Sequence, residues 1–319
     1  MNRILIVGAG RRVQEDVLPV LESIPETFDS LSFVATKSRQ LIGRCRTYEV
    51  LPIFHIRNFK DFDYIYIAVP PSALRSVLKH LNTAQSNAEL IVDTPADISW
   101  STLSMIRRFR RVHVAEDVVM LPWIDTLHNF WRSNNLSGMV SVEFDRSAYF
   151  YHGVALAKVI CGSFDSPGNV IKSGRRGSTL SIQLDRGRVV MNEPRDYEKG
   201  IIRLSRGGVV ISSHVEPESI TLQIIRNDKL CRGFQIDSVK SELSLAESKL
   251  IGNVEDEDTI VSRMLDIKRV GLLKMMIQIA SGKSPWSLEQ GQDDFRVAAV
   301  SPGRFGRLSW FIESIRRFR

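Results

Sequence analysis

Ile4-Leu5-Ile6-Val7-Gly8-Ala9-Gly10, near the start of the 319-residue chain, decides the fold class. Four apolar residues predict a strand that is buried on both faces, and residues 13–24 have the apolar spacing of a helix. A Gly-x-Gly between a first strand and a first helix lets the backbone turn tightly and approach a pyrophosphate at the helix N-terminus. Val13 replaces the third glycine of the full pattern. The stretch predicts a dinucleotide site at Gly8 and Gly10, with a purely structural turn as the alternative.

The same alternation of apolar strands and helical segments continues through the first 122 residues. Strands that are apolar on both faces belong to a parallel sheet covered by helices. We therefore expect residues 1–122 to form a Rossmann domain that binds a dinucleotide. Its further strands are predicted at 31–35, 48–51, 63–68, 89–92 and 112–115, and its further helices at 72–81 and 100–109.

Beyond residue 122 turn signals become frequent and the strands become half polar. This pattern favours an open antiparallel sheet with one face covered by helices. We expect residues 123–319 to form an α+β domain with a large, mostly antiparallel sheet. Its strands are predicted at 139–144, 170–172, 179–184, 189–191, 200–204, 209–212, 220–225 and 230–236, and its helices at 123–132, 149–161 and 258–280, with a shorter one from Leu288.

Composition excludes several classes of partner. The net charge is +7, but the Lys and Arg residues are scattered, so no nucleic-acid partner is expected. No apolar run is long enough to span a membrane, and the first run is too short for a signal peptide. Three widely spaced cysteines without a Cys-x-x-Cys indicate a reducing compartment, and we expect the cytoplasm. The histidines lack metal-ligand spacing, so no metal site is expected.

The segment after the second strand bears on cofactor choice. It reads Thr36-Lys37-Ser38-Arg39 and lacks the acid that would bind the ribose 2′-hydroxyl of NAD. Hydroxyls and cations suit a 2′-phosphate better, so the sequence favours NADP over NAD, which remains possible, as does a plain basic loop. Arg11 and Arg12 either add charge to the phosphate site or are solvated.

Two other strands end in loops that we expect beside the cofactor. Ala68, Pro70 and Pro71 follow one of them, where the prolines cannot continue a sheet. Asp93 and Pro95 follow the next. Ligands of Rossmann domains bind at the carboxyl ends of the strands, so these residues are candidate cofactor contacts.

In this order the motifs resemble those of the Gfo/Idh/MocA family, named after glucose–fructose oxidoreductase and inositol dehydrogenase. The resemblance is carried by Gly-Ala-Gly at 8–10, Ile-Ala-Val-Pro-Pro at 67–71, Asp-Thr-Pro at 93–95, Val-His-Val-Ala-Glu at 112–116 and Leu-Ser-Gly at 136–138. It implies a dinucleotide-binding domain, a second domain whose open sheet makes homodimer or tetramer contacts, and a small-molecule substrate held between the two.

The chain departs from this family in its catalytic residues. The resemblance places Thr94 where members carry a lysine that polarises the reacting group, and Ala148 where they carry an aspartate. His152 matches the family's histidine and could exchange a proton with a substrate oxygen near neutral pH. Tyr149 and Tyr151 flank it and could also donate a proton, or simply pack. The candidate catalytic residues are His152, Thr94 and Tyr151.

Together these features predict an NAD(P)-dependent oxidoreductase. The favoured reaction is NADPH-dependent reduction of a carbonyl or imine, or else oxidation of a hydroxyl, in a small metabolite or sugar-like substrate. The alternative is a cofactor-binding protein that has lost catalysis and acts as a partner or regulatory subunit. The loss of the lysine and the aspartate favours that alternative.

Overall fold

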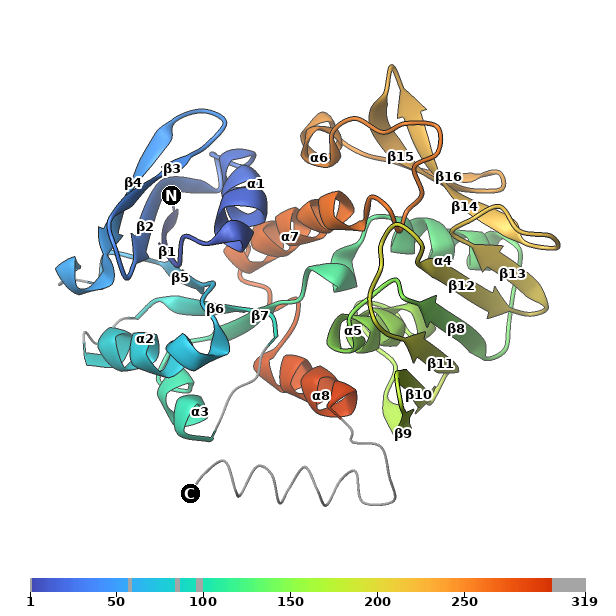
Figure 1. The fold of residues 1–319 in the computed structure, drawn as a ribbon, viewed down its shortest axis with the longest axis horizontal. Helices are drawn as coiled ribbons and strands as arrows, with labels where there is room; N and C mark the ends of the chain where they lie inside the picture. Colours follow the sequence, from blue (N-terminus) through green and yellow to red (C-terminus); the bar gives the residue numbers. More distant parts are fainter. Residues whose placement is uncertain (1, 57–58, 84–86, 96–99, 300–319) are drawn as a thin grey trace. The chain divides into compact units, whose positions relative to one another are not determined.

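The computed structural model describes residues 2–56, 59–83, 87–95 and 100–299, and these form two compact units (Figure 1). The first comprises the residues up to Asp117 together with Leu272–Gln292. The second comprises Val118–Gly271 and the described residues from Asp293 onward. The two unit boundaries nearest the C-terminus lie within helices: one in α7 (Met264–Ala280) and one in α8 (Leu288–Ala298). The division of the chain into domains 1–122 and 123–319 stays a prediction.

Within the described residues, the first unit contains a seven-stranded sheet in the order β3-β4-β2-β1-β5-β6-β7. All neighbouring pairs are parallel except β3–β4, which confirms the predicted parallel sheet. β5 is buried along its whole length, as expected for a strand covered on both faces. The strands are β1 (Asn2–Val7), β2 (Phe28–Ala35), β3 (Arg39–Ile42), β4 (Thr47–Pro52), β5 (Tyr64–Ile67), β6 (Glu89–Asp93) and β7 (Val112–Ala115).

The helices of this unit follow the strands as predicted. After β1 the chain forms a π-helical segment (Val13–Val17) that continues into α1 (Leu18–Glu22). α2 (Pro71–Thr83) follows β5, and α3 (Trp100–Ile106) follows β6. Strand β3 was not predicted. Most of its residues are exposed, so the strand lacks the apolar run by which the buried strands were predicted.

The second unit contains a nine-stranded sheet in the order β16-β15-β14-β13-β12-β8-β11-β10-β9, counted over the same described residues. Only β8–β11 and β13–β14 pair in parallel, so the prediction of a mostly antiparallel sheet is confirmed. The strands are β8 (Val140–Asp145), β9 (Val170–Arg176), β10 (Thr179–Leu184), β11 (Gly187–Asn192), β12 (Ile201–Arg206), β13 (Val209–Ser212), β14 (Ile220–Asn227), β15 (Leu230–Ile236) and β16 (Val239–Glu242).

Helices pack on this sheet. α5 (Phe150–Cys161) contacts β8, β10 and β11, and nearly all of its residues are buried. α4 (Trp123–Ser133) and α6 (Leu245–Ile251) contact β15. A buried helix carries its side chains into packed surroundings on every side, so the polar residues of α5 are enclosed by protein.

The predicted start of the long helix at residue 258 is wrong, because α7 begins at Met264. The Asp258 carboxylate accepts a hydrogen bond from the Glu255 backbone N–H at 2.9 Å. Thr259 and Ser262 accept from each other's backbone N–H groups. Such side chain–backbone bonds compete with helix formation.

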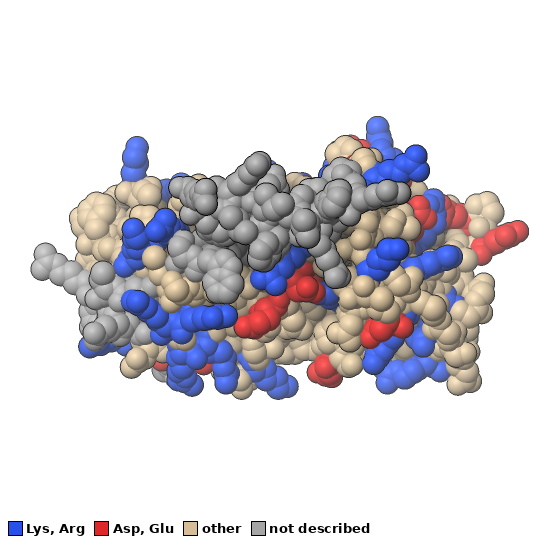
Figure 2. Space-filling view, turned by 90° about the horizontal axis from the view of Figure 1, so that it is seen from below, with Lys and Arg blue, Asp and Glu red and all other residues tan. Residues whose placement is uncertain are grey.

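The charged surface is mixed. On the face shown in Figure 2, Lys and Arg side chains are spread among acidic and uncharged ones. This is the distribution of a solvated surface. Within the described part of the chain, no helix combines the length and the apolar character needed to cross a bilayer.

Candidate functional site

The loop between β1 and the first helical segment begins at a glycine that the fold requires. Gly8 has φ +120°, a conformation that side chains rarely adopt, and an added Cβ would overlap the carbonyl oxygen of Ala68. Its N–H donates to the carbonyl oxygen of Val34 at 2.8 Å. Gly8 therefore lets the ends of β1, β2 and β5 approach one another closely.

Gly10 differs from Gly8 because no contact with a described residue requires a glycine at this position. Its φ lies outside the left-handed region, and a Cβ built on it would meet no described atom within 4 Å. The residue is exposed, and its carbonyl accepts the N–H of Gln14 at the start of the helical segment. Helix starts present N–H groups without intrahelical partners. A glycine here leaves room for a group that approaches those N–H donors.

The other predicted cofactor residues come together at one edge of the sheet. Thr36-Lys37-Ser38-Arg39 follows β2, Ala68 and Pro70 follow β5, and Asp93 ends β6. These strands lie side by side with β1 in the order β2-β1-β5-β6. Because they are parallel, their carboxyl ends share an edge, as predicted. Residues 36–39 are exposed, Pro71 begins α2, and Thr94 precedes Pro95 through a cis peptide bond.

Arg12 occupies a different environment from Arg11. Its guanidinium lies 2.8 Å from Asp117, 3.2 Å from Asp16 and 3.3 Å from Asp93. Its side chain is 26% exposed, whereas that of Arg11 is 81% exposed and pairs with Glu15 on the helix surface. Arg12 is therefore not a solvated surface charge. A cofactor contact for either arginine stays a prediction.

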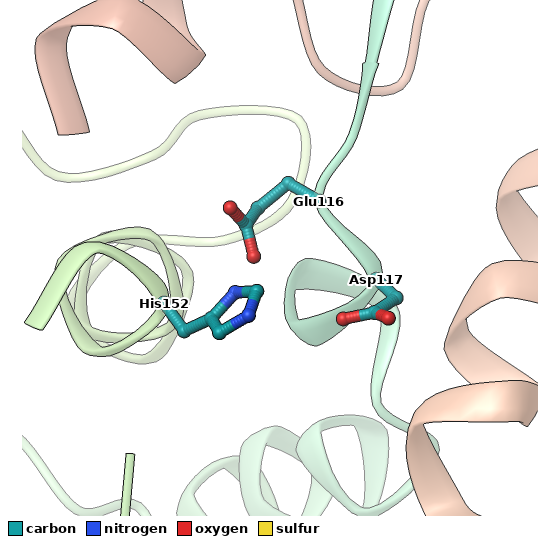
Figure 3. A group of neighbouring side chains, drawn as sticks. All are labelled: Glu116, Asp117 and His152. Atoms are coloured by element: carbon teal, nitrogen blue, oxygen red, sulfur yellow. The ribbon is translucent and has the colours of Figure 1, made fainter. Parts of the chain in front are cut away.

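The carboxylates around Arg12 form a network that the sequence did not reveal. The hydroxyl of Tyr66, on β5, donates to Asp93 at 2.9 Å. Burial raises the pKa of Asp93, and the Arg12 guanidinium opposes that rise. Figure 3 shows Asp117 directly after Glu116, where the chain leaves β7. Arg12 thus ties the first helical segment to the ends of β6 and β7.

In the second unit, His152 projects from α5 (Figure 3) and is buried. Its Nε2 lies 3.0 Å from the Nζ of Lys268, a buried lysine on α7. An ammonium group donates hydrogen bonds and accepts none, so a protonated Lys268 would donate to this nitrogen. The His152 ring also lies 4.2 Å from the ring centre of Tyr151, which stacks on Tyr149 with 5.9 Å between centres.

Lys268 was missed by the sequence reasoning. The apolar stripe predicted for the long helix was correctly assigned to the core, although its first member precedes α7. All of its members are buried: Ile260, Met264, Ile267, Val270, Leu273 and Met276. The sequence held one signal that this helix is buried on more than one side: Leu272 and Met275 lie outside that stripe and are apolar as well. A helix that is apolar all round is buried, so a lysine within it needs a specific partner.

Comparisons with known proteins bear on the fold. No family model matches the chain, and no curated protein matches it in sequence. Solved structures match over nearly the whole length. An oxidoreductase from Agrobacterium radiobacter, in complex with NAD+, L-tartaric acid and magnesium, is 11% identical with a TM-score of 0.57, covering 100% of this chain and 97% of that one.

Two further structures agree with this match. A dehydrogenase from Clostridium difficile is 12% identical with a TM-score of 0.57, covering 93% of this chain and 97% of its own. A Gfo/Idh/MocA family oxidoreductase from Vibrio cholerae is 13% identical with a TM-score of 0.53, covering 99% and 100%. The chain therefore has the fold of the Gfo/Idh/MocA oxidoreductases, as its motifs predicted.

Proposed function

We propose that this chain is an oxidoreductase that binds a nicotinamide dinucleotide at the Gly8–Gly10 loop and transfers hydride to or from a small substrate. The observation that carries the proposal is Gly10. Among the described residues nothing requires a glycine at this position, since a Cβ would have open space at an ordinary φ. A pyrophosphate bound close to the backbone would require one. The shared fold with known dehydrogenases supports the same conclusion.

Residues at the carboxyl ends of the parallel strands would hold the cofactor. The backbone N–H groups after Gly10 would bind the pyrophosphate, and the segments after β5 and β6 would offer further contacts at Ala68, Pro70, Asp93 and Pro95. When bound, the reduced nicotinamide supplies the hydride. Lys37 and Arg39 are exposed and favour a 2′-phosphate, so NADPH is the proposed partner, although the similar structure from Agrobacterium holds NAD+.

His152 gives or takes the proton that accompanies hydride transfer. It lies at the start of α5, and its Nε2 is held by Lys268 at 3.0 Å. An imidazole can both accept and donate a proton, which general acid–base catalysis requires. The proposed reaction is reduction of a carbonyl or imine, with Tyr151 as a second candidate donor and Thr94 contributing a hydroxyl.

The test is to titrate the protein with NADPH and NADH and to follow nucleotide fluorescence. Wild type should bind, and Gly10→Val should lose binding while keeping its fold. Gly174→Val is the matched control, because Gly174 in β9 also has open space and an ordinary φ. The proposal is overturned if the wild-type protein binds neither nucleotide at about 1 mM, the upper end of ordinary KM values. If NADH binds tenfold more tightly than NADPH, a difference in binding free energy of about 1.4 kcal/mol, only the proposed preference for NADP is overturned.

The second candidate is a cofactor-binding partner subunit without catalysis. It is favoured by Thr94 and Ala148, which stand where the resemblance implies a lysine and an aspartate. Turnover separates the two functions. If the protein binds NADPH but no carbonyl or imine in a broad panel of metabolites makes it oxidise the NADPH, the result supports the partner subunit.

A further inference from the structure

The loop that joins β11 to β12 crosses the carboxyl end of β8, because these two strands flank β8 in the sheet (Figure 1). Its position is fixed by hydrogen bonds. The Glu193 carboxylate accepts the backbone N–H of Phe150 at 3.2 Å, at the first residue of α5. The backbone N–H of Asp196 donates to the carbonyl oxygen of Arg146 at 2.8 Å, just after β8. Arg195 lies between these two anchored residues, so its backbone is held over the start of α5.

The guanidinium of Arg195 contacts two tyrosine rings. Its Cζ lies 4.1 Å from the ring centre of Tyr149 and 4.5 Å from that of Tyr197. A guanidinium this close to an aromatic ring is attracted by the electron-rich face of the ring. These contacts involve no hydrogen bond, so they leave the N–H groups, which lie in the plane of the guanidinium, available to a ligand.

Among the described residues, none accepts a hydrogen bond from Arg195 and no carboxylate forms an ion pair with it. The nearby acids are engaged elsewhere. Glu193 binds the start of α5, and the Asp196 carboxylate accepts the backbone N–H groups of Glu198 and Lys199. A partly buried guanidinium with its five N–H groups uncommitted matches a carboxylate or a phosphate, which it binds through two parallel hydrogen bonds.

The same cluster reaches the candidate proton donor. The Tyr149 ring, which stacks on Arg195, also lies 6.4 Å from the His152 ring between centres. Tyr151 stacks on Tyr149 and contacts His152 at 4.2 Å. Tyr149 therefore lies next to both residues, with its ring centre 4.1 Å from the Cζ of Arg195 and 6.4 Å from the ring centre of His152.

We propose that Arg195, clamped by Tyr149 and Tyr197, binds the anionic group of a small substrate whose reacting carbon faces His152. The substrate class is then a carboxylated or phosphorylated metabolite. This rests on the proposed function for the reaction at His152, but anion binding at Arg195 does not need the cofactor.

The test measures binding by calorimetry with four probes: glucose 6-phosphate, glucuronate, inorganic phosphate and uncharged glucose. Wild type should bind at least one of the two charged hexoses tenfold or more tightly than glucose. Arg195→Met should abolish that difference. Arg195→Lys keeps the charge but neither the fork nor the stacked plane, and should lose about tenfold. The preferred hexose tells a phosphate from a carboxylate.

Arg175→Met is the matched control. Arg175 also stacks on an aromatic ring, with 4.9 Å between its Cζ and the ring centre of Phe150, but its Nε is bonded to the carbonyl oxygen of Gly177. This variant should bind the probes like wild type. Equal affinity for charged hexoses and glucose, including no binding of any probe, overturns the proposal, as does an Arg195→Met protein that still binds. Anion binding without affinity for NADPH or NADH would instead overturn the proposed function and leave this site standing.

Discussion

Replacing Arg12 by leucine tests whether the ion-pair network holds the first unit together. The substitution removes a cation that lies 2.8 Å from Asp117 and 3.3 Å from Asp93. The side chains of these acids are 0% and 13% exposed, so water replaces little of what is lost. Arg11→Leu is the control at the neighbouring position, since Arg11 is largely exposed and pairs with Glu15 on the helix surface.

The two variants should differ strongly in free energy of unfolding. Removing one partner of a buried ion pair costs about 3–5 kcal/mol, because the remaining charge is left in a poorly solvated place. Breaking an exposed pair four residues apart on a helix costs about 0.3–0.5 kcal/mol. For a domain-sized unit each 1 kcal/mol shifts Tm by about 2–4 °C, so Arg12→Leu should lower Tm by roughly 6–20 °C.

The loss should also depend on pH. Burial already raises the pKa of Asp93 in the folded protein, and Arg12 opposes that rise. Without Arg12 the folded-state pKa rises further above the unfolded value, so the fold favours the protonated acid. Such a group supports the fold below its unfolded pKa, and that support is lost as pH rises through the folded value. The penalty of Arg12→Leu should therefore be largest near neutral pH and shrink as the solution is acidified.

Urea unfolding of both variants and wild type, at pH 7.5 and at pH 5, measures this directly. An Arg12→Leu protein that stays within 0.5 kcal/mol of Arg11→Leu at pH 7.5 would refute the reasoning, since the network would then contribute no more than a surface pair. A penalty that grows on acidification would refute its electrostatic origin.

Two further predictions concern the glycine loop and the proton donor. Gly8→Ala should destabilise the protein by about 2–4 kcal/mol in urea unfolding, through steric overlap and an unfavourable φ, whereas Gly10→Ala should be neutral or slightly stabilising; equal stability of the two variants would contradict the assignment. His152→Ala should lower turnover ~10²–10⁴-fold at unchanged cofactor affinity. Lys268→Met removes the group that lies 3.0 Å from the Nε2 of His152 and should lower turnover at unchanged cofactor affinity; unchanged turnover would make Lys268 purely structural.

The sequence predicted the architecture where burial leaves a strong pattern. The strands of the first unit are apolar on both faces, and the loops after β1, β5 and β6 carry glycine or proline at the turns. Both sheets were therefore expected, including their parallel and antiparallel characters. Strand β3 was missed because an edge strand of four mostly exposed residues has no apolar run. The start of α7 was missed because local side-chain bonds at 255–262 interrupt a pattern that otherwise continues.

The candidate site was predictable only where a motif is local. Gly8 and Gly10 lie in one short loop, and His152 lies in a helix that the resemblance identifies. Lys268 is 116 residues from His152 in sequence, and no spacing rule joins residues so far apart. Arg11 and Arg12 could not be told apart from the sequence, because they are adjacent and chemically identical. Only the helical path separates them, turning one toward Asp93 and the other toward solvent.

The threonine at residue 94, where the resemblance implies a lysine, is the main argument against catalysis. A pair of buried side chains in the second unit counts against that argument. What catalysis needs is a polar group that exchanges a proton and is held in place. His152 is buried and its Nε2 is bound by Lys268 at 3.0 Å, so the imidazole is held in place although the resemblance implies a lysine elsewhere in the chain. Within the second unit, the pair therefore provides the fixed polar group that the proposed enzyme requires.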